Sequence, residues 1–218
     1  MSRTLDDALR WSAEGTALVR RALGGLDSDE SLAQPSALPG WTRKHLLAHV
    51  AANADAIGNL VSWAKTGVET PMYSSTGQRN ADIEAGAGRP ADELVAWFER
   101  SAGELDEGFD SLTDAEWAHE VVTAQGRTVP ASETPWMRAR EVMVHSVDLD
   151  GGISFDDLPA DFLHALEADI RAKRTASGHE VPEVTGPHAH VVAWLAGRDH
   201  HDVTTTDGTA APTLPAWL

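Results

Sequence analysis

Four long segments of this 218-residue chain carry the signals of amphipathic helices, and this limits the fold more than any other feature. Apolar side chains recur in them at helical spacing, and glycine, proline or a capping residue marks their ends. The segments are residues 4–24, 42–67, 91–110 and 134–149. Helices that each bury one apolar face are expected to pack together, so the sequence predicts a mainly α fold built on an antiparallel four-helix bundle.

The starts of two helices can be assigned to particular residues. Thr42 precedes the second helix and is expected to be its N-cap, because a threonine hydroxyl accepts from the unpaired N–H groups of the first turn. Thr134 is expected to cap the fourth helix in the same way, with Pro135 at the first helical position.

The connections between the helices differ in character. Residues 67–90 form a long irregular stretch, which predicts a loop with about one helical turn near 80–85. Before the fourth helix, β-forming residues alternate on either side of Gln125-Gly126. This pattern predicts a short hairpin within residues 120–132.

The pattern changes near residue 153, and we expect two domains. Residues 1–153 are predicted to form the helical bundle, and residues 154–218 a small C-terminal α/β region. In this region the sequence predicts a helix at 157–176, a shorter one at 190–196 and at most two short strands around residues 207–208.

Charge and composition exclude several classes of partner. A formal net charge of −17 disfavours nucleic acid and anionic membranes, because an acidic surface repels phosphate groups. No segment approaches the roughly 18 consecutive apolar residues of a membrane span, and the N-terminus lacks the apolar stretch of a signal peptide. We therefore expect a cytoplasmic protein. The sequence leaves its oligomeric state open and is compatible with a monomer.

Cysteine is absent from the chain. This excludes disulfides, thiolate zinc fingers and a cysteine nucleophile. Any thiol chemistry must therefore use a thiol from outside the protein.

One carboxylate and two histidines are the strongest candidates for a metal site. Glu141 and His145 are four residues apart on the fourth helix, which is about one turn, so both side chains leave the same face. His49, on the second helix, would complete the set. Three protein ligands with one open position are typical of catalytic zinc. Spacing alone also fits ordinary polar pairing, but the apolar neighbours of Glu141 and His145 favour a metal, since a buried carboxylate needs a cation to stay ionised.

The remaining histidines are weaker candidates. His188 and His190 form one pair near the C-terminus, and His200 and His201 form another. Solvated histidine clusters are common near a chain end, so we do not expect these pairs to bind metal. His45 faces the first turn of its helix and is expected to cap or pack there.

Anionic substrates would need arginine partners. Among the arginines, Arg79 in the long connection and Arg198 after Gly197 are the two candidates for binding carboxylates. The others, Arg138 among them, are expected to be solvated surface charges. Asn53 and Asp148 lie close in sequence to the predicted ligands and are candidates to orient the imidazoles.

Three stretches cover most of residues 40–150: GWTRKHLLAHVAANADAIGNLVSWAKTGVETPMY, QRNADIEAG and HEVVTAQGRTVPASETPWMRAREVMVHSVDL. They resemble the mycothiol-dependent maleylpyruvate isomerases of actinobacteria, which belong to the DinB-like superfamily of metal-dependent bundles. The resemblance implies a DinB-like bundle in which His49, Glu141 and His145 bind zinc. Family members carry a C-terminal α/β domain with several strands, whereas residues 177–187 leave space for little more than one. We therefore expect an abbreviated C-terminal region, with Arg198 in the place of the family's C-terminal arginine.

The resemblance also implies an activity. It is the conversion of maleylpyruvate to fumarylpyruvate, a step of gentisate degradation, with mycothiol as the thiol cofactor and a small dicarboxylate as the substrate. Thiolate addition to the C=C bond leaves a single bond that can rotate, and elimination restores the alkene as trans. A thiol with a pKa of about 8.5 is mostly protonated at neutral pH, and zinc would deprotonate it. Two alternatives remain open: a mycothiol S-transferase acting on another electrophile, and a non-catalytic metal-binding bundle.

Overall fold

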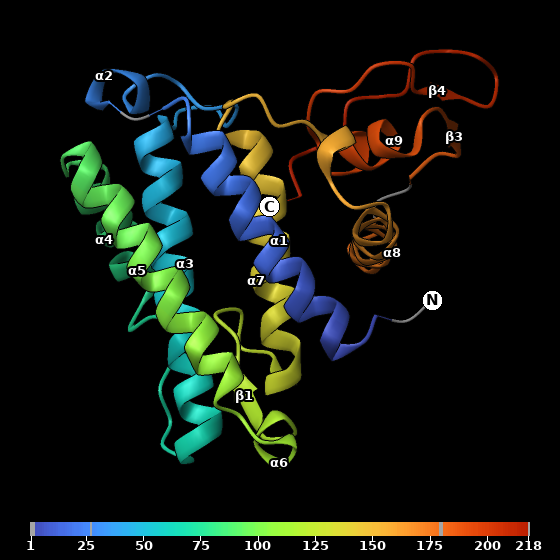
Figure 1. Cartoon of the computed structure of the whole chain (residues 1–218). Helices are drawn as coiled ribbons and strands as arrows, with labels where there is room; N and C mark the ends of the chain where they lie inside the picture. Colours follow the sequence, from blue (N-terminus) through green and yellow to red (C-terminus); the bar gives the residue numbers. More distant parts are fainter. Residues whose placement is uncertain (1–2, 27, 179–180, 218) are drawn as a thin grey trace. The chain divides into compact units, whose positions relative to one another are not determined.

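The computed structural model describes residues 3–26, 28–178 and 181–217. The chain divides into two compact units, one comprising Thr4–Ile153 and the other containing the residues from Ser154 onward. The described chain is mainly helical, and its strands are two or three residues long (Figure 1). The predicted mainly α fold is therefore confirmed.

Four long helices form the frame of the first unit. They are α1 (Leu5–Leu23), α3 (Arg43–Thr66), α5 (Ala91–Asp110) and α7 (Thr134–Asp148). Each lies within the segment predicted for it. α1 packs against α7, and α3 packs against both α5 and α7, so that apolar side chains from all four helices are buried between them.

The helices run up, down, down and up in chain order (Figure 1). α3 and α7, which carry the predicted metal ligands, are antiparallel. Arg43, in the first turn of α3, donates through Nε to the carbonyl of Leu149, which follows the last residue of α7. His49 near the start of α3 therefore faces the C-terminal half of α7, where Glu141 and His145 lie.

The predicted N-cap of α3 is confirmed, whereas the predicted N-cap of α7 is not the residue observed. The Thr42 hydroxyl accepts from the backbone N–H of His45, and the His45 ring accepts from the backbone of Thr42, so both residues cap α3 as expected. The prediction for α7 was wrong. A 3-10 turn, η1 (Ala131–Glu133), runs directly into α7, so Thr134 rather than Pro135 is its first residue. The Thr134 hydroxyl donates to the carbonyl of Ala131 instead of capping.

The long connection after α3 is more ordered than predicted. It contains α4 (Thr76–Ala87), a helix of 12 residues that packs against α3, so the prediction of a single turn was wrong. The helix has few large apolar residues, with Ile83 alone among them deeply buried, and its sequence therefore lacks a clear helical period. Two further short helices, α2 (Asp29–Leu32) and α6 (Asp114–Trp117), also lie outside the predicted segments.

The predicted hairpin before α7 is confirmed. β1 (Glu120–Val122) pairs antiparallel with β2 (Thr128–Pro130), and Gly126 adopts a positive φ of 76° in the turn. This left-handed conformation favours glycine, which lacks the Cβ that would be strained there.

The second unit consists of short elements around two helices. They are η2 (Phe155–Asp157), α8 (Ala160–Ala176), β3 (Val184–Thr185), α9 (His188–Leu195) and β4 (Thr204–Thr205). β3 and β4 pair antiparallel. The buried guanidinium of Arg174 on α8 donates to the backbone carbonyls of Leu195 and Pro215, which fixes α8 to the end of α9.

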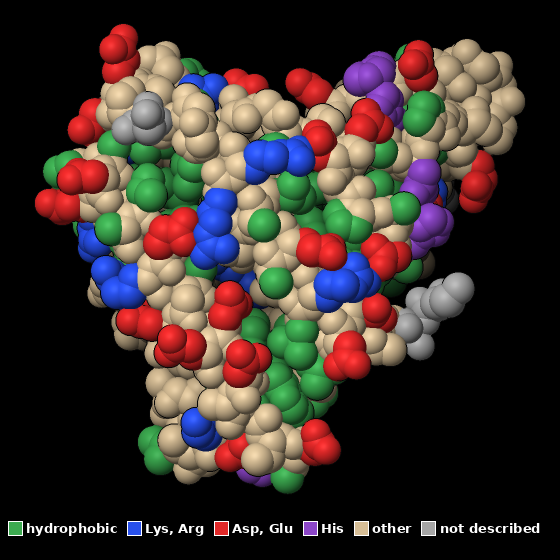
Figure 2. Space-filling model, in the orientation of Figure 1, with side chains coloured by type: hydrophobic (Ala, Val, Ile, Leu, Met, Phe, Trp, Pro, Cys, Tyr) green, Lys and Arg blue, Asp and Glu red, His purple; other side chains and the backbone are tan. Residues whose placement is uncertain are grey.

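The face of the protein shown in Figure 2 carries many acidic side chains, with lysines and arginines between them. This distribution agrees with the net charge of −17. Within the part of the chain that the structure describes, no helix has both the length and the apolar character that crossing a bilayer requires.

Candidate metal centre

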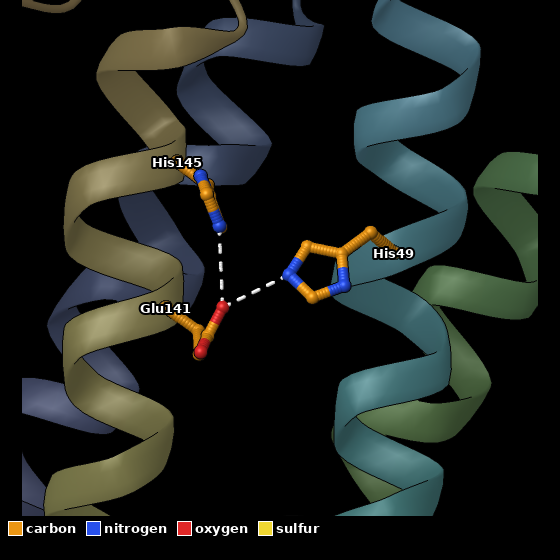
Figure 3. A group of neighbouring side chains, drawn as sticks. All are labelled: His49, Glu141 and His145. Carbon is orange, nitrogen blue, oxygen red and sulfur yellow. Dashed lines mark hydrogen bonds and ion pairs between the residues drawn. The ribbon is translucent and has the colours of Figure 1, made fainter. Parts of the chain in front are cut away.

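Three side chains from two facing helices meet inside the bundle (Figure 3). His49 comes from α3, and Glu141 and His145 come from α7. The Nε2 atom of His49 lies 3.0 Å from Oε2 of Glu141, and Nε2 of His145 lies 3.2 Å from the same oxygen. Ligand atoms from all three lie within 4.8 Å of one another. Among the described residues, this is the one group of three histidine or acidic side chains that could hold a metal ion.

Burial and mutual contact set the charges of the cluster. Burial by itself raises the pKa of Glu141, but hydrogen bonds from His145 and His49 hold it well below its usual value. Burial lowers the pKa of His145, yet its bonds to Asp148 and Glu141 raise that pKa to about 9. For His49 burial outweighs the attraction of Glu141, and the pKa is lowered. At neutral pH an ionised carboxylate therefore lies between a neutral imidazole and a protonated one.

Asp148 holds the His145 ring in place. The Nδ1–H of His145 donates to Oδ2 of Asp148 over 2.9 Å, and both side chains are buried. This contact, expected from the sequence, directs Nε2 towards Glu141. The same expectation for Asn53 was wrong, because its Oδ1 accepts from Arg138, 2.9 Å away.

The donor set fits a divalent metal such as zinc. Two imidazoles and one carboxylate are ligands that zinc commonly takes. When His145 is neutral, its one ring proton stays on Nδ1, which donates to Asp148, and Nε2 presents a lone pair. This arrangement is usual for metal-binding histidines. Trp41 packs its ring edge-on to His49, with 5.6 Å between the ring centroids, and limits the movement of that imidazole.

Arg79, one of the two arginines predicted to bind carboxylates, lies beside the cluster. It is on α4 rather than in a loop, and its Nη2 is 3.3 Å from Nδ1 of His49. A guanidinium can only donate, so Nδ1 accepts and Nε2 carries the proton that His49 donates to Glu141. Arg79 also hydrogen-bonds Tyr73, the single tyrosine of the chain, whose pKa is raised by burial.

Arg198, the other predicted arginine, belongs to the second unit. Its Nη1 donates to the carbonyl of Ala196, 2.8 Å away. Arg138 differs from its predicted position on the surface: its side chain is only 1% exposed, inside the first unit. The pattern that could have revealed this is its place three residues before Glu141, on the same face of α7.

The C-terminal histidines contact other residues of the second unit. Nε2 of His190 lies 3.2 Å from a carboxylate oxygen of Asp156, and its Nδ1 donates to the carbonyl of His201. Nε2 of His188 lies 2.9 Å from Glu167. These are pairwise contacts on the second unit rather than a three-ligand set.

The fold and the cluster define a class of protein: a helical bundle whose facing helices present two imidazoles and a carboxylate that could hold a metal ion. The family model described as the mycothiol maleylpyruvate isomerase N-terminal domain matches residues 12–150. The chain therefore belongs to the mycothiol maleylpyruvate isomerase family, which is a family of enzymes.

Two solved structures are similar over the whole chain. One is a crystal structure of the mycothiol-dependent maleylpyruvate isomerase, 40% identical, with a TM-score of 0.92. The other is that isomerase with a histidine replaced by alanine, with the same identity and TM-score. Each comparison covers 99% of this chain and 98% of the other, so the chains have nearly the same length. The expectation of a C-terminal region abbreviated relative to the family is therefore not supported. Among curated proteins, none matches this sequence.

Proposed function

We propose that this protein is a mycothiol-dependent isomerase that converts maleylpyruvate to fumarylpyruvate in gentisate degradation. The observation that carries the proposal is the convergence of His49, Glu141 and His145 from α3 and α7 in a chain without cysteine. Membership of the isomerase family and 40% identity to the mycothiol-dependent enzyme support it.

We infer that the cluster binds zinc through an imidazole nitrogen of each histidine and a carboxylate oxygen of Glu141. When bound, zinc supplies an open position at which an external thiol loses its proton near neutral pH. The protein's part is to present the ligands. Asp148 fixes the tautomer of His145, Trp41 restrains the ring of His49, and the low pKa of Glu141 keeps its carboxylate ionised.

The isomerisation itself is addition followed by elimination. The thiolate of mycothiol forms a C–S bond to one alkene carbon, and the π electrons move to the conjugated carbonyl oxygen as an enolate. The former double bond is now single and rotates. The enolate then returns its electrons, the C–S bond breaks and the trans alkene forms with the thiolate released. No atom or electron is gained or lost overall, so the reaction needs no oxidant or reductant.

We propose that Arg79 binds a substrate carboxylate. If Nε2 of His49 is a metal ligand, the ring proton must reside on Nδ1, and Arg79 can no longer donate to that atom. Its guanidinium, 3.3 Å away from Nδ1, then has a donor available for an anion. The substrate has two carboxylates, and we propose Arg198 for the second, on the strength of the family resemblance.

Metal content and a thiol-dependent assay test the proposal. Purified protein should contain about one zinc per chain. His49→Ala should lose most of it, whereas His164→Ala, an exposed histidine on α8, should keep it. Absorbance of maleylpyruvate should fall when mycothiol is supplied and stay constant without it. A His49→Ala protein that retains its zinc would show that the ligands are misassigned.

The same assay separates the alternatives. A mycothiol S-transferase would leave maleylpyruvate unchanged and conjugate mycothiol to other electrophiles. A non-catalytic bundle would bind zinc and turn over neither. The isomerase is favoured because the similar solved structures that span the whole chain are described as maleylpyruvate isomerases.

A further inference from the structure

Arg138 is a charged side chain buried at the contact between the two helices of the metal cluster. It lies on α7, three residues before Glu141, and is 1% exposed. Its Nη1 donates over 2.7 Å to the carbonyl of Val50 and over 2.9 Å to Oδ1 of Asn53. Both acceptors belong to α3, and Val50 follows His49 directly. One guanidinium therefore connects the two helices next to the pair formed by His49 and Glu141.

Stability does not explain a charge at this place. Burial lowers the pKa of Arg138 to about 10, so the guanidinium is still protonated at neutral pH. Its Nη2 is buried without a hydrogen-bond partner among the described residues. Carboxylates attract the guanidinium only through charge interactions at longer range, and the strongest of these is with Glu141. Replacing a buried ion together with its partners by apolar side chains is often neutral or stabilising, so the fold itself does not require the charge.

The position of Arg138 points instead to the geometry of the cluster. The guanidinium is rigid and planar, and its Nη1 alone donates to two acceptors that lie three residues apart on α3. This fixes α3 against α7 in register and in separation. His49 directly precedes Val50 on α3, and its Nε2 lies 3.0 Å from Oε2 of Glu141 on α7.

We propose that Arg138 is a positioning residue for the metal centre, setting the distance of His49 on α3 from Glu141 on α7. It acts through those two ligands and touches neither metal nor substrate. The role rests on the proposed function in one respect, that the cluster binds metal. Its positive charge also favours the ionised carboxylate of Glu141.

Zinc affinity of the full-length protein tests this role without using activity. Arg138→Met removes the charge and the Nη1 donor, whereas Arg138→Lys keeps a charge but loses the rigid planar group that holds this donor between α3 and α7. Both variants should bind Zn²⁺ at least about tenfold more weakly, measured by competition with a chromophoric chelator. Arg174→Met is the matched control, because Arg174 is also buried and bonded to backbone carbonyls, but in the second unit. Its Zn²⁺ affinity should equal that of the wild type.

Thermal unfolding of the metal-free proteins separates positioning from general support of the fold. We expect the double variant Arg138→Met with Asn53→Leu, which removes the buried ion together with its side-chain partner, to unfold at the wild-type temperature or above. Arg138→Met alone leaves Oδ1 of Asn53 without its donor and should unfold at a somewhat lower temperature. Unchanged Zn²⁺ affinity in Arg138→Met and Arg138→Lys would overturn the positioning role and leave the proposed function standing. A wild-type protein that binds no Zn²⁺ would overturn both. If Arg138→Met does not fold, Asn53→Ala can be used instead, because it removes one of the two acceptors of Nη1. Unchanged Zn²⁺ affinity in Asn53→Ala likewise overturns the role.

Discussion

Asp148 accepts the Nδ1–H of His145 across one turn of α7, with 2.9 Å between nitrogen and oxygen and both side chains buried. The bond fixes which way the imidazole faces. Its other nitrogen, Nε2, points to Glu141, 3.2 Å away. A proposed metal ligand and the residue that orients it therefore lie on the same helix, at a spacing of three residues.

Asp148→Asn should weaken zinc binding about 10- to 100-fold, the effect usual for loss of such an orienting partner. The amide keeps the size of the side chain but removes the negative charge that holds the Nδ1 proton. Asp156→Asn is a suitable control, because Asp156 pairs with His190 in the second unit. Chelator competition on both variants measures the effect. Equal affinities in the two variants would contradict the role given to Asp148.

Zinc affinity should increase with pH up to about pH 9. The pKa of His145 is raised to about 9 in the metal-free protein, so at neutral pH a metal must displace a proton from it. Burial lowers the pKa of His49, which is already neutral, and Glu141 is already ionised. About one proton should therefore be released per zinc, and the affinity should rise roughly tenfold per pH unit between pH 7 and pH 9. Titration in weakly buffered solution with a pH electrode measures the release directly.

The raised pKa of His145 also predicts how the stability of the metal-free protein depends on pH. The folded pKa of His145 lies above the unfolded value of 6.5. Its contribution to the free energy of unfolding is therefore fully present below about pH 6.5. The contribution is lost as pH rises towards 9. Denaturant unfolding of metal-free protein should thus show a lower free energy of unfolding at pH 9 than at pH 6.5. In Asp148→Asn, which removes one cause of the raised pKa, this decrease should be smaller.

The four long helices and the pair Glu141 and His145 could be predicted because both depend on local spacing. Apolar residues at helical period place α1, α3, α5 and α7 without reference to the rest of the chain. One helical turn between Glu141 and His145 puts them on one face wherever that helix packs. The position of His49 opposite them depends on how α3 meets α7, and here the resemblance to a known family added what spacing lacks.

The features that sequence could not provide depend on tertiary contacts. α4 has too few apolar residues to show a period, and it is held by packing on α3. Thr134 has the residue type of an N-cap, but the preceding 3-10 turn extends the helical path past it. Arg138 was expected on the surface because charged residues usually are, and only the carbonyl of Val50 and the amide of Asn53 explain its burial.

Arg79→Ala should raise KM for maleylpyruvate and leave the zinc content unchanged. Its guanidinium contacts His49 from α4 but is not a ligand, and loss of a charged hydrogen bond to a carboxylate commonly costs about 1.5–3 kcal/mol, roughly a 10- to 150-fold increase in KM. Arg89→Ala is the control, since Arg89 follows α4 and stacks on Trp97 instead. If Arg79→Ala lost its zinc, Arg79 would support the ligands rather than the substrate.

Gly15 permits the close approach of α1 to the part of α7 that carries the ligands. A Cβ at this residue would lie 2.4 Å from Cγ2 of Val142 and 3.1 Å from the backbone nitrogen of Met143. Gly15→Ala should therefore lower the free energy of unfolding by about 1–3 kcal/mol, because the helices must separate. Gly58→Ala, on α3, should be neutral or stabilising by up to about 1 kcal/mol, since no atom lies within 4 Å of its Cβ. Denaturant unfolding of both metal-free variants measures the difference.

Because Val142 adjoins Glu141, Gly15→Ala should also bind zinc more weakly. Wild-type zinc affinity in a destabilised Gly15→Ala would show that the α1–α7 contact does not affect the proposed ligands.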